Sequence, residues 1–187
     1  LGQYYDTSGN TFGGRIVVNT TTSGDQHDAQ ALTLSGNKVL VSYRMSDGSS
    51  NGIFGKIYDS AGNVLKNEFR LNATTTSDQA HHEFRSLADG GFILTYASAD
   101  AGSNYRILAQ RYDNNGDAVG SELQLGAYSV NMRQHFGTIV QLSSGDLVFS
   151  WQKTSNNTAA TMTDDKVFFQ RFSLSGSDYV QETSILE

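Results

Sequence analysis

Four histidines recur at one place in this sequence, each one to three residues after a glutamine. They are His27, His81, His82 and His135. Imidazoles that converge from equivalent positions of a repeat can surround an axis and bind a metal ion. Histidines at such unequal offsets are also common in turns and at strand edges, and adjacent histidines point to opposite faces of a strand. The pattern is therefore a candidate metal site with a structural alternative.

A second candidate metal site is the segment Asp113-Asn-Asn-Gly-Asp117, in which Asp113, Asn115 and Asp117 offer carboxylate and amide oxygens. Calcium binds several oxygens that converge from one loop. The segment lacks the acidic residue that closes an EF-hand loop. The aspartate recurs as Asp6 and Asp59 ahead of a glycine, which is typical of a hairpin turn. We expect no obligatory cofactor, and calcium is the ion that this loop would suit.

Three aromatic residues occupy one equivalent position: Tyr43, Tyr96 and Trp151 each end a short apolar run. Aromatic rings at repeated sites can stack on the apolar faces of sugar rings, so these residues are candidates for glycan binding. Packing between neighbouring units is the structural alternative.

Three asparagines match the N-glycosylation acceptor pattern Asn-x-Ser/Thr, namely Asn19, Asn72 and Asn156. Asn19 and Asn72 precede threonine-rich tracts at equivalent positions. If a glycosylating host exports the chain, we expect these loops to carry glycans.

Catalytic motifs and basic surfaces are not evident. The sequence has no Gly-x-Ser-x-Gly elbow, no His-Glu-x-x-His motif and no phosphate-binding loop. The glutamates that a glycosidase would need are scattered, so we expect no enzyme activity. A formal charge of −6 argues against nucleic acid as a partner. No apolar run approaches the 18 or more residues of a membrane span, so we expect no membrane insertion.

These candidates sit in an internal repeat of roughly 54 residues. Its recurring turn glycines, Gly9, Gly62, Gly116 and Gly176, are 53, 54 and 60 residues apart. Each full copy has four short apolar segments bounded by turn residues, and none has a useful helical period. The pattern predicts an all-β chain of 187 residues in a single repeat domain, with a half unit at 1–26 and full units at 27–79, 80–134 and 135–187.

Four strands in about fifty residues are typical of a β-propeller blade. We therefore expect a β-propeller or propeller-like assembly of four-stranded antiparallel blades, with three and a half repeats in the chain. The motifs aromatic-Gly-Gln-Arg-Tyr-Asp-x-x-Gly-Asn, Asn-Thr-Thr-Thr-x-x-Asp-Gln and Leu-x-Asp-Gly-Gly-Phe resemble the propeller-type repeats of large secreted bacterial adhesin-like and calcium-toxin-like proteins. This resemblance implies a fold more specifically than an activity.

The half unit is a candidate functional feature, because unpaired strand edges are usually covered. We expect its missing strands to come from another copy of the chain or from flanking repeats of a longer parent, in a filament or a closed ring. The function that follows is an extracellular or cell-surface, non-catalytic repeat protein with a structural or adhesive role. A glycan-binding, lectin-like propeller is the alternative, and a carbohydrate-active enzyme is a third hypothesis.

Overall fold

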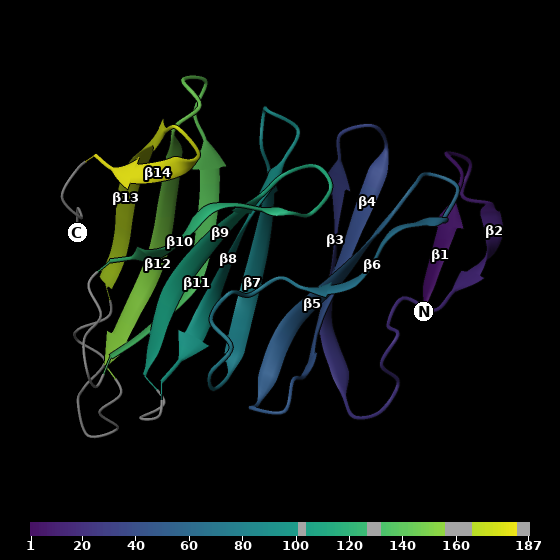
Figure 1. Cartoon of the computed structure of the whole chain (residues 1–187), viewed down its shortest axis with the longest axis horizontal. Coiled ribbons are helices and arrows are strands. Elements are labelled where there is room, and N and C mark those ends of the chain that lie inside the picture. Colours follow the sequence, from purple (N-terminus) through teal and green to yellow (C-terminus); the bar gives the residue numbers. More distant parts are fainter. Residues whose placement is uncertain (101–103, 127–131, 156–165, 183–187) are drawn as a thin grey trace.

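A computed structural model describes residues 1–100, 104–126, 132–155 and 166–182, and these residues fold into β-strands joined by turns and loops (Figure 1). The strands, in chain order, are β1 (Gly2–Tyr5), β2 (Thr11–Ile16), β3 (Gln26–Leu34), β4 (Lys38–Ser46), β5 (Asn51–Tyr58), β6 (Val64–Arg70), β7 (Gln79–Ser86), β8 (Phe92–Ala99), β9 (Tyr105–Tyr112), β10 (Ala118–Leu125), β11 (Met132–Gln141), β12 (Leu147–Ser155), β13 (Lys166–Ser175) and β14 (Asp178–Gln181). The predicted all-β class is confirmed. Across the described ranges, no helix has the length and apolarity needed to cross a membrane.

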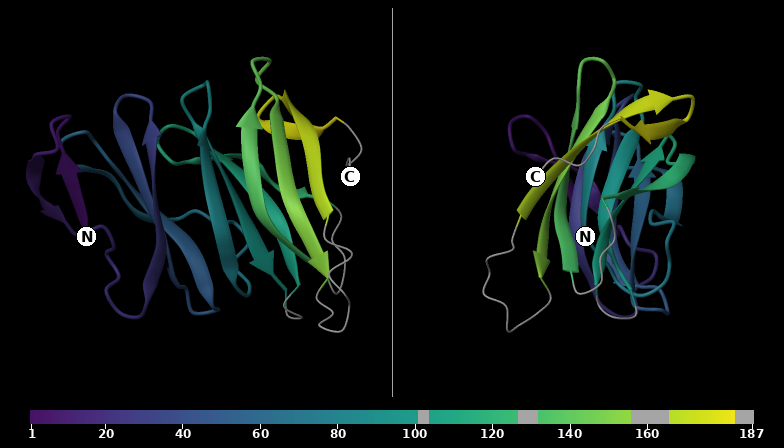
Figure 2. Two further views of the ribbon diagram at one scale, coloured as in Figure 1. Left: turned by 180° about the vertical axis from the view of Figure 1, so that it is seen from behind. Right: turned by 90° about the vertical axis from the view of Figure 1, so that its left-hand side faces the viewer.

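The strands pair as antiparallel neighbours in four groups. The half unit is the pair β1–β2, and the three full units are β3–β6, β7–β10 and β11–β14, each in the order of the chain. One parallel residue pair, Arg133 with Tyr105, joins β11 to β9. The units stand side by side in a row from the N-terminus to the C-terminus, and a view along the row shows them one behind another (Figures 1 and 2). The predicted four-stranded antiparallel blade is thus confirmed.

In the half unit and the first two full units, an aspartate closes the hairpin between the third and fourth strands. In the first full unit, Asp59 Oδ1 accepts hydrogen bonds from the backbone N–H of Ala61 at 2.9 Å and of Asn63 at 2.8 Å. Gly62 adopts a φ of 89°, which a residue with a Cβ rarely takes. Asp6 and Asp113 close the equivalent turns in the same way. The recurring aspartate is therefore a turn residue.

The core lies between the units rather than inside one sheet. All eight residues of β8 are buried, because unit β3–β6 covers one face and unit β11–β14 the other. On one side Phe92, Leu94 and Tyr96 pack against residues of the preceding unit; on the other, Ile93 and Ala97 join Phe149 and Trp151 of the following unit. A strand buried on both faces is apolar at consecutive positions, as this segment is.

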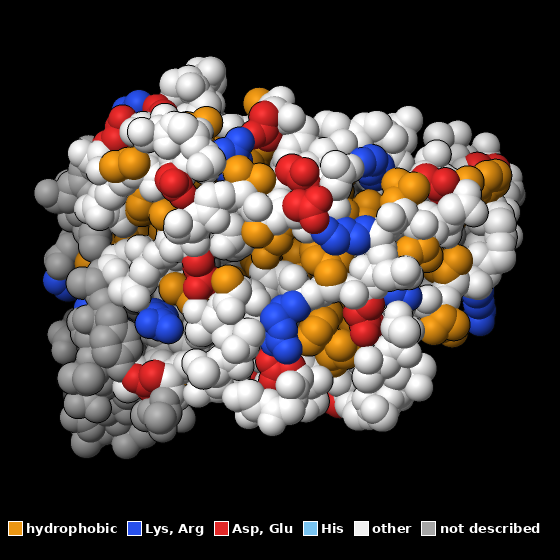
Figure 3. Space-filling model, in the orientation of Figure 1, with side chains coloured by type: hydrophobic (Ala, Val, Ile, Leu, Met, Phe, Trp, Pro, Cys, Tyr) orange, Lys and Arg blue, Asp and Glu red, His pale blue; other side chains and the backbone are white. Residues whose placement is uncertain are grey.

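The surface seen in Figure 3 mixes charges of both signs with apolar side chains. Ion pairs join some of the charged side chains of the described residues. Lys66 Nζ lies 2.7 Å from Asp117 Oδ1 and links the first two full units. Arg70 Nη1 lies 2.5 Å from Asp47 Oδ2 within the first.

Candidate functional site

A pocket of about 420 Å³, lined by several polar residues, lies where the first strands of the three full units meet. We call it the first-strand pocket. The residues that line it come from β3, β7 and β11: Asp28, Ala29, Gln30, His81, His82, Glu83, Gly137 and Thr138. A site between several blades draws its side chains from segments far apart in sequence.

A bulge in each first strand positions these residues. The strand register shifts between His27 and Gln30, between Ala80 and Glu83, and between His135 and Thr138. Within the bulges, Asp28 has a φ of 54° and His81 a φ of 50°, in the left-handed region that residues other than glycine seldom adopt. Bulges of this kind re-aim side chains and are frequent beside functional sites.

His82 forms a buried part of the pocket. Only 2% of the residue is exposed, and its Nε2 lies 3.2 Å from Ser42 Oγ of the preceding unit. Burial disfavours the charged imidazolium and lowers the pKa of His82 to about 4. The ring is therefore neutral at pH 7. Its Nδ1 is buried with no hydrogen-bond partner among the described protein atoms.

Asp28 is held by a guanidinium that two carboxylates share. Arg44 donates from Nη1 to Asp28 Oδ2 at 2.8 Å and from Nη2 to Asp78 Oδ1 at 2.9 Å. The hydrogen bond from Arg44 is the main reason why the pKa of Asp28 lies below its ordinary value. Asp28 is thus ionised at neutral pH, and its side chain remains half exposed toward solvent.

The pocket is rich in hydrogen-bond acceptors. Among the residues that line it, Asp28 and Glu83 carry carboxylates and Thr138 carries a hydroxyl. Gln30 crosses to the next unit, where its Nε2 donates to the backbone carbonyl of His82 at 2.5 Å. Such a surface suits a ligand with many hydroxyl donors and no negative charge.

The three aromatic residues proposed for sugar stacking are inside the protein. Tyr43 is 4% exposed, Tyr96 0% and Trp151 2%. Tyr43 and Tyr96 donate their hydroxyls to Glu68 and Glu122, on the fourth strands of their own units. Trp151 stacks on Phe168, with 5.9 Å between ring centroids. The structure therefore places these rings in packing positions, as in the structural alternative above.

The asparagines proposed as glycan acceptors have structural contacts where they are described. Asn72 is 2% exposed; its Oδ1 accepts from the Ile53 N–H at 2.7 Å, and its Nδ2 donates to the Thr74 carbonyl at 2.7 Å. Asn19, which is half-buried, donates to the Thr21 carbonyl at 2.7 Å. A glycan on the Asn72 amide would have to displace these hydrogen bonds in the folded chain, and the acceptor role of Asn19 and Asn72 stays a prediction. Asn156 lies outside the described residues.

The oxygens proposed for calcium already have partners. Asp113 Oδ1 accepts from the N–H groups of Asn115 at 2.8 Å and Asp117 at 2.9 Å. Asp117 pairs with Lys66. In the part of the chain that is described, no three His, Asp or Glu side chains are grouped so that they could hold a metal ion.

The described histidine side chains do not share one cavity. His81 and His82 line the first-strand pocket, whereas His27 lines a different cavity and lies 3.9 Å from Asp28 Oδ2 through its Nε2. The side chain of His135 is outside the described residues.

Sequence reasoning missed Asp28, Gln30, Glu83 and Thr138 as members of one site. One feature of the sequence could have linked them. Each of these four residues lies two to four positions after a glutamine at or near the start of a first strand. The residue types differ between copies, so only the bulge geometry shows that the side chains share a pocket.

Comparison with known proteins informs the fold. No family model matches the sequence, and no curated protein matches it either. Among solved structures, the chain is similar to a thermostable family-43 glycoside hydrolase with a TM-score of 0.54 and 12% identity, covering 85% of this chain and 54% of that one.

Two further similar structures come from Bacteroides thetaiotaomicron VPI-5482. An endo-1,4-beta-xylanase gives a TM-score of 0.54 and 10% identity over 87% of this chain and 60% of that one. An endo-arabinase gives a TM-score of 0.51 and 14% identity over 92% of this chain and 66% of that one. The chain thus spans between about half and two thirds of these enzymes. At such identities the similarity establishes the fold, which is propeller-type.

One sequence-based prediction is wrong. The chain was expected to be a structural or adhesive repeat protein that assembles through its incomplete unit. The three similar solved structures described above are glycoside hydrolases and not adhesive repeats, so they favour the glycan-binding alternative. The resemblance to adhesin-like and toxin-like repeats and the extracellular location stay predictions.

Proposed function

We propose that this chain is a carbohydrate-binding β-propeller whose first-strand pocket holds the hydroxyl groups of a neutral oligosaccharide. The observation that carries the proposal is the set of polar side chains that the bulges of β3, β7 and β11 bring together. Sugar hydroxyls donate hydrogen bonds readily, and the carboxylates of Asp28 and Glu83 accept them strongly.

The similar solved structures suggest which sugars to try first. Their names describe a family-43 glycoside hydrolase, an endo-1,4-beta-xylanase and an endo-arabinase. Xylan and arabinan chains carry no charge on their unsubstituted sugar rings, which suits an acceptor-rich pocket. We therefore choose short β-1,4-xylo-oligosaccharides and arabino-oligosaccharides as ligands.

The proposed activity is binding without cleavage. Glycosidases use a pair of carboxyl groups, one of which keeps its proton because its pKa is raised. Arg44 has the opposite effect on Asp28, whose pKa it lowers. Asp28 is therefore suited to accepting hydrogen bonds and unsuited to donating a proton to a leaving group.

The test is isothermal titration calorimetry with the full chain and the two oligosaccharide series. We expect Glu83→Gln and Thr138→Val to weaken binding by about tenfold each, which corresponds to about 1.4 kcal/mol. Glu182→Gln is the matched control, because Glu182 pairs with Arg171 and does not line the pocket. The proposal would be refuted if neither oligosaccharide series binds. It would also be refuted if Glu83→Gln, Thr138→Val and Glu182→Gln all bind the oligosaccharides with the same affinity.

A hydrolase is the second candidate, favoured by one observation: Asp28 and Glu83 share a pocket in a propeller-type fold. An assay for new reducing ends on xylan and arabinan separates the two. Release of reducing ends that Glu83→Gln abolishes and Glu182→Gln leaves intact would replace the binding function by a catalytic one.

A further inference from the structure

Arg44 links two walls of the first-strand pocket without being part of its lining. The residue is 9% exposed and lies on β4, the second strand of the first full unit. Its guanidinium bonds to Asp28 on β3 and to Asp78, the residue directly before β7 of the next unit. One buried cation thus connects the strand that carries Asp28 with the strand that carries Glu83.

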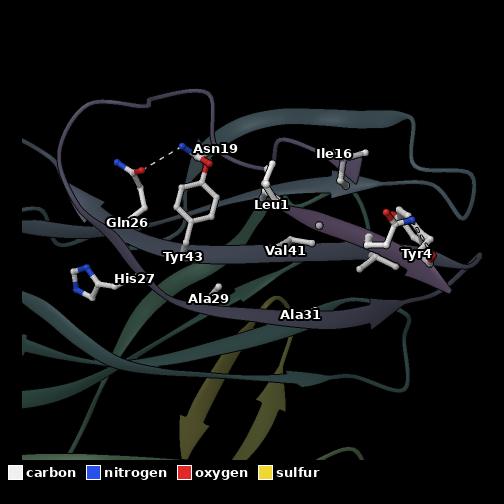
Figure 4. Close-up of a pocket in the computed structure, with 14 residues that line it drawn as sticks. Leu1, Tyr4, Ile16, Asn19, Gln26, His27, Ala29, Ala31, Val41 and Tyr43 are labelled. Carbon is white, nitrogen blue, oxygen red and sulfur yellow. Dashed lines mark hydrogen bonds between the residues drawn. The ribbon is translucent and has the colours of Figure 1, made fainter. Parts of the chain in front are cut away.

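The alternation of side chains along β4 turns Arg44 toward the second full unit. Figure 4 shows the ring of Tyr43 on one face of β4, where it lines the cavity beside the half unit. Ser42 and Arg44 flank Tyr43 in sequence, so they lie on the other face. There Ser42 Oγ lies 3.2 Å from His82 Nε2, and the guanidinium reaches Asp78. Both of these side chains therefore bond to β7 or to the residue before it.

Asp78 is also held by donors from other strands. Its Oδ1 accepts a hydrogen bond from Asn51 Nδ2 at 2.9 Å, and its Oδ2 accepts one from the Tyr105 hydroxyl at 3.4 Å. Asn51 begins β5 and Tyr105 begins β9, so two full units fix this carboxylate. Asp78 is therefore an anchor whose position does not depend on Arg44 alone.

Asp28 depends on Arg44 to a greater degree. In the part of the chain that the structure describes, Arg44 is the one hydrogen-bond donor to the Asp28 carboxylate. His27 Nε2 lies 3.9 Å from Oδ2 of Asp28, beyond hydrogen-bonding distance. The side chain of Asp28 is half exposed, so without the guanidinium it would be free to turn toward solvent.

Arg44 and Asp28 occur together in the first full unit, and neither recurs in the next. Strand pairing aligns Arg44 with Ala97 in the second full unit and with Gln152 in the third. It aligns Asp28 with His81, which has the same left-handed backbone conformation. A contact that every blade requires would recur, as the hairpin aspartates do. The pair is therefore tied to the pocket and not to the blade.

We propose that Arg44 is a positioning residue of the first-strand pocket, which holds the Asp28 carboxylate in the orientation that accepts hydrogen bonds from a bound sugar. The inference rests on the carbohydrate-binding function proposed above, and Arg44 itself does not contact the sugar. Its second partner, Asp78, lies five positions before Glu83, so the same guanidinium fixes where the two carboxylates of the pocket stand relative to each other. Polar groups that are fixed before a ligand arrives bind it with a smaller loss of conformational entropy.

The affinity for sugar at pH 7 tests this role. Titration calorimetry uses the two oligosaccharide series and full chains whose Tm shows them to be folded. We expect Arg44→Gln to weaken binding about tenfold. Arg44→Lys should weaken it less, because lysine keeps the charge but lacks the fork of two nitrogens. A role in stability alone would lower Tm and leave the affinity of the folded chain unchanged.

Arg171→Gln is the matched control for these variants. Arg171 likewise pairs with two carboxylates, those of Asp146 and Glu182, and lies outside the pocket lining. We expect it to bind sugar as the unaltered chain does. If Arg44→Gln does not fold, Arg44→Lys and Arg171→Lys take the places of the two glutamine variants.

A double-mutant cycle shows whether Arg44 acts through Asp28. The substitution Asp28→Asn removes the charge that Arg44 holds. We expect Arg44→Gln to cause no further loss of affinity in the Asp28→Asn background, because both substitutions then break the same contact.

A second measurement needs no sugar. Titratable or charged side chains near Asp28 come from three strands: His27 of β3, Arg44 of β4, and His81, His82 and Glu83 of β7. The hydrogen bond from Arg44 has the largest effect and lowers the pKa of Asp28. The carboxyl carbon signal of Asp28 in NMR reports the pH at which this group takes up its proton. We expect that pH to be higher in Arg44→Gln than in Arg171→Gln.

The outcomes separate this inference from the proposed function. If the unaltered chain binds neither oligosaccharide series, the proposed function is refuted and the inference with it. If the unaltered chain binds sugar, three results would overturn the inference alone: equal affinity of Arg44→Gln and Arg171→Gln, a loss caused by Arg44→Gln that persists in the Asp28→Asn background, or the same Asp28 titration in Arg44→Gln and Arg171→Gln.

Discussion

The side-chain amide of Asn72 donates a hydrogen bond to Gln79 Oε1 at 3.1 Å, and Asn19 makes the same contact with Gln26 at 3.3 Å one unit earlier. The glutamine in turn donates to two backbone carbonyls of the intervening loop, those of Thr76 and Ser77 in the later copy. This pair closes the loop that leads from the fourth strand of one unit into the first strand of the next.

Replacing Asn72 with Ala should destabilise the protein by about 2–4 kcal/mol. The substitution removes the acceptor of the buried Ile53 N–H and the donor to Gln79 Oε1. Urea unfolding measures the effect. Asn19→Ala is the internal comparison and should cost less, because Asn19 is only half-buried; equal losses would contradict the role of burial.

Tyr96→Phe tests the buried hydroxyl that bonds to Glu122. The ring stays, but the carboxylate loses a donor and the Thr74 N–H loses an acceptor that lies 3.3 Å away. We expect a loss of about 1–3 kcal/mol in the free energy of unfolding. Tyr5→Phe should change it by less than about 0.5 kcal/mol, since Tyr5 is 64% exposed.

His82 should make stability depend on pH. Its pKa is about 4 in the folded chain, below the ordinary value of 6.5, because burial disfavours the charged ring. Between these values only the unfolded state binds the proton, so stability falls as pH drops from 6.5 to about 4. The total loss in the free energy of unfolding is about 3 kcal/mol. Measuring the free energy of unfolding of the original protein and of His82→Gln between pH 6.5 and 4 isolates this contribution. If the free energy of unfolding depends on pH with the same slope in both proteins, His82 is not the cause.

Gly91→Ala should destabilise the second full unit. An added Cβ would lie 2.4 Å from the backbone oxygen of Tyr112, which cannot move without breaking strand pairing. Overpacking of this kind costs about 1–3 kcal/mol. Gly14→Ala is the matched control, because its Cβ would meet nothing within 4 Å. A similar Tm for both variants would show that β9 can shift to accept the methyl group.

Charge should decide which sugars bind in the first-strand pocket. Asp28 and Glu83 face a ligand there, so a uronic acid would bring a third carboxylate close to them. We expect an oligosaccharide with a uronic acid to bind at least about tenfold more weakly than its neutral counterpart. The difference should shrink at high salt and in Glu83→Gln. Tighter binding of the acidic sugar would contradict the proposed pocket chemistry.

Local features of the fold could be predicted from the sequence because they depend on neighbouring residues. The aspartates at 6, 59 and 113 close hairpins with their own backbone, and Gly62 has the positive φ that such a turn requires. Short apolar segments bounded by turn residues likewise identified the strands. The hydrogen bonds that close the turns join residues two and four positions apart, so spacing along the chain contains the information.

The sites depended on contacts that spacing does not encode. Tyr43 and Tyr96 could equally well face a sugar or a neighbouring unit, and only the tertiary structure shows that they are buried against glutamates about 25 residues away. Asp28 and Glu83 are 55 positions apart in sequence and share a pocket because two first strands bulge beside each other. The sequence by itself determined the repeat, the strands and the turns. Tertiary packing decided which repeated side chains are buried and which line a cavity, because burial depends on the neighbouring unit and not on the residue's own segment.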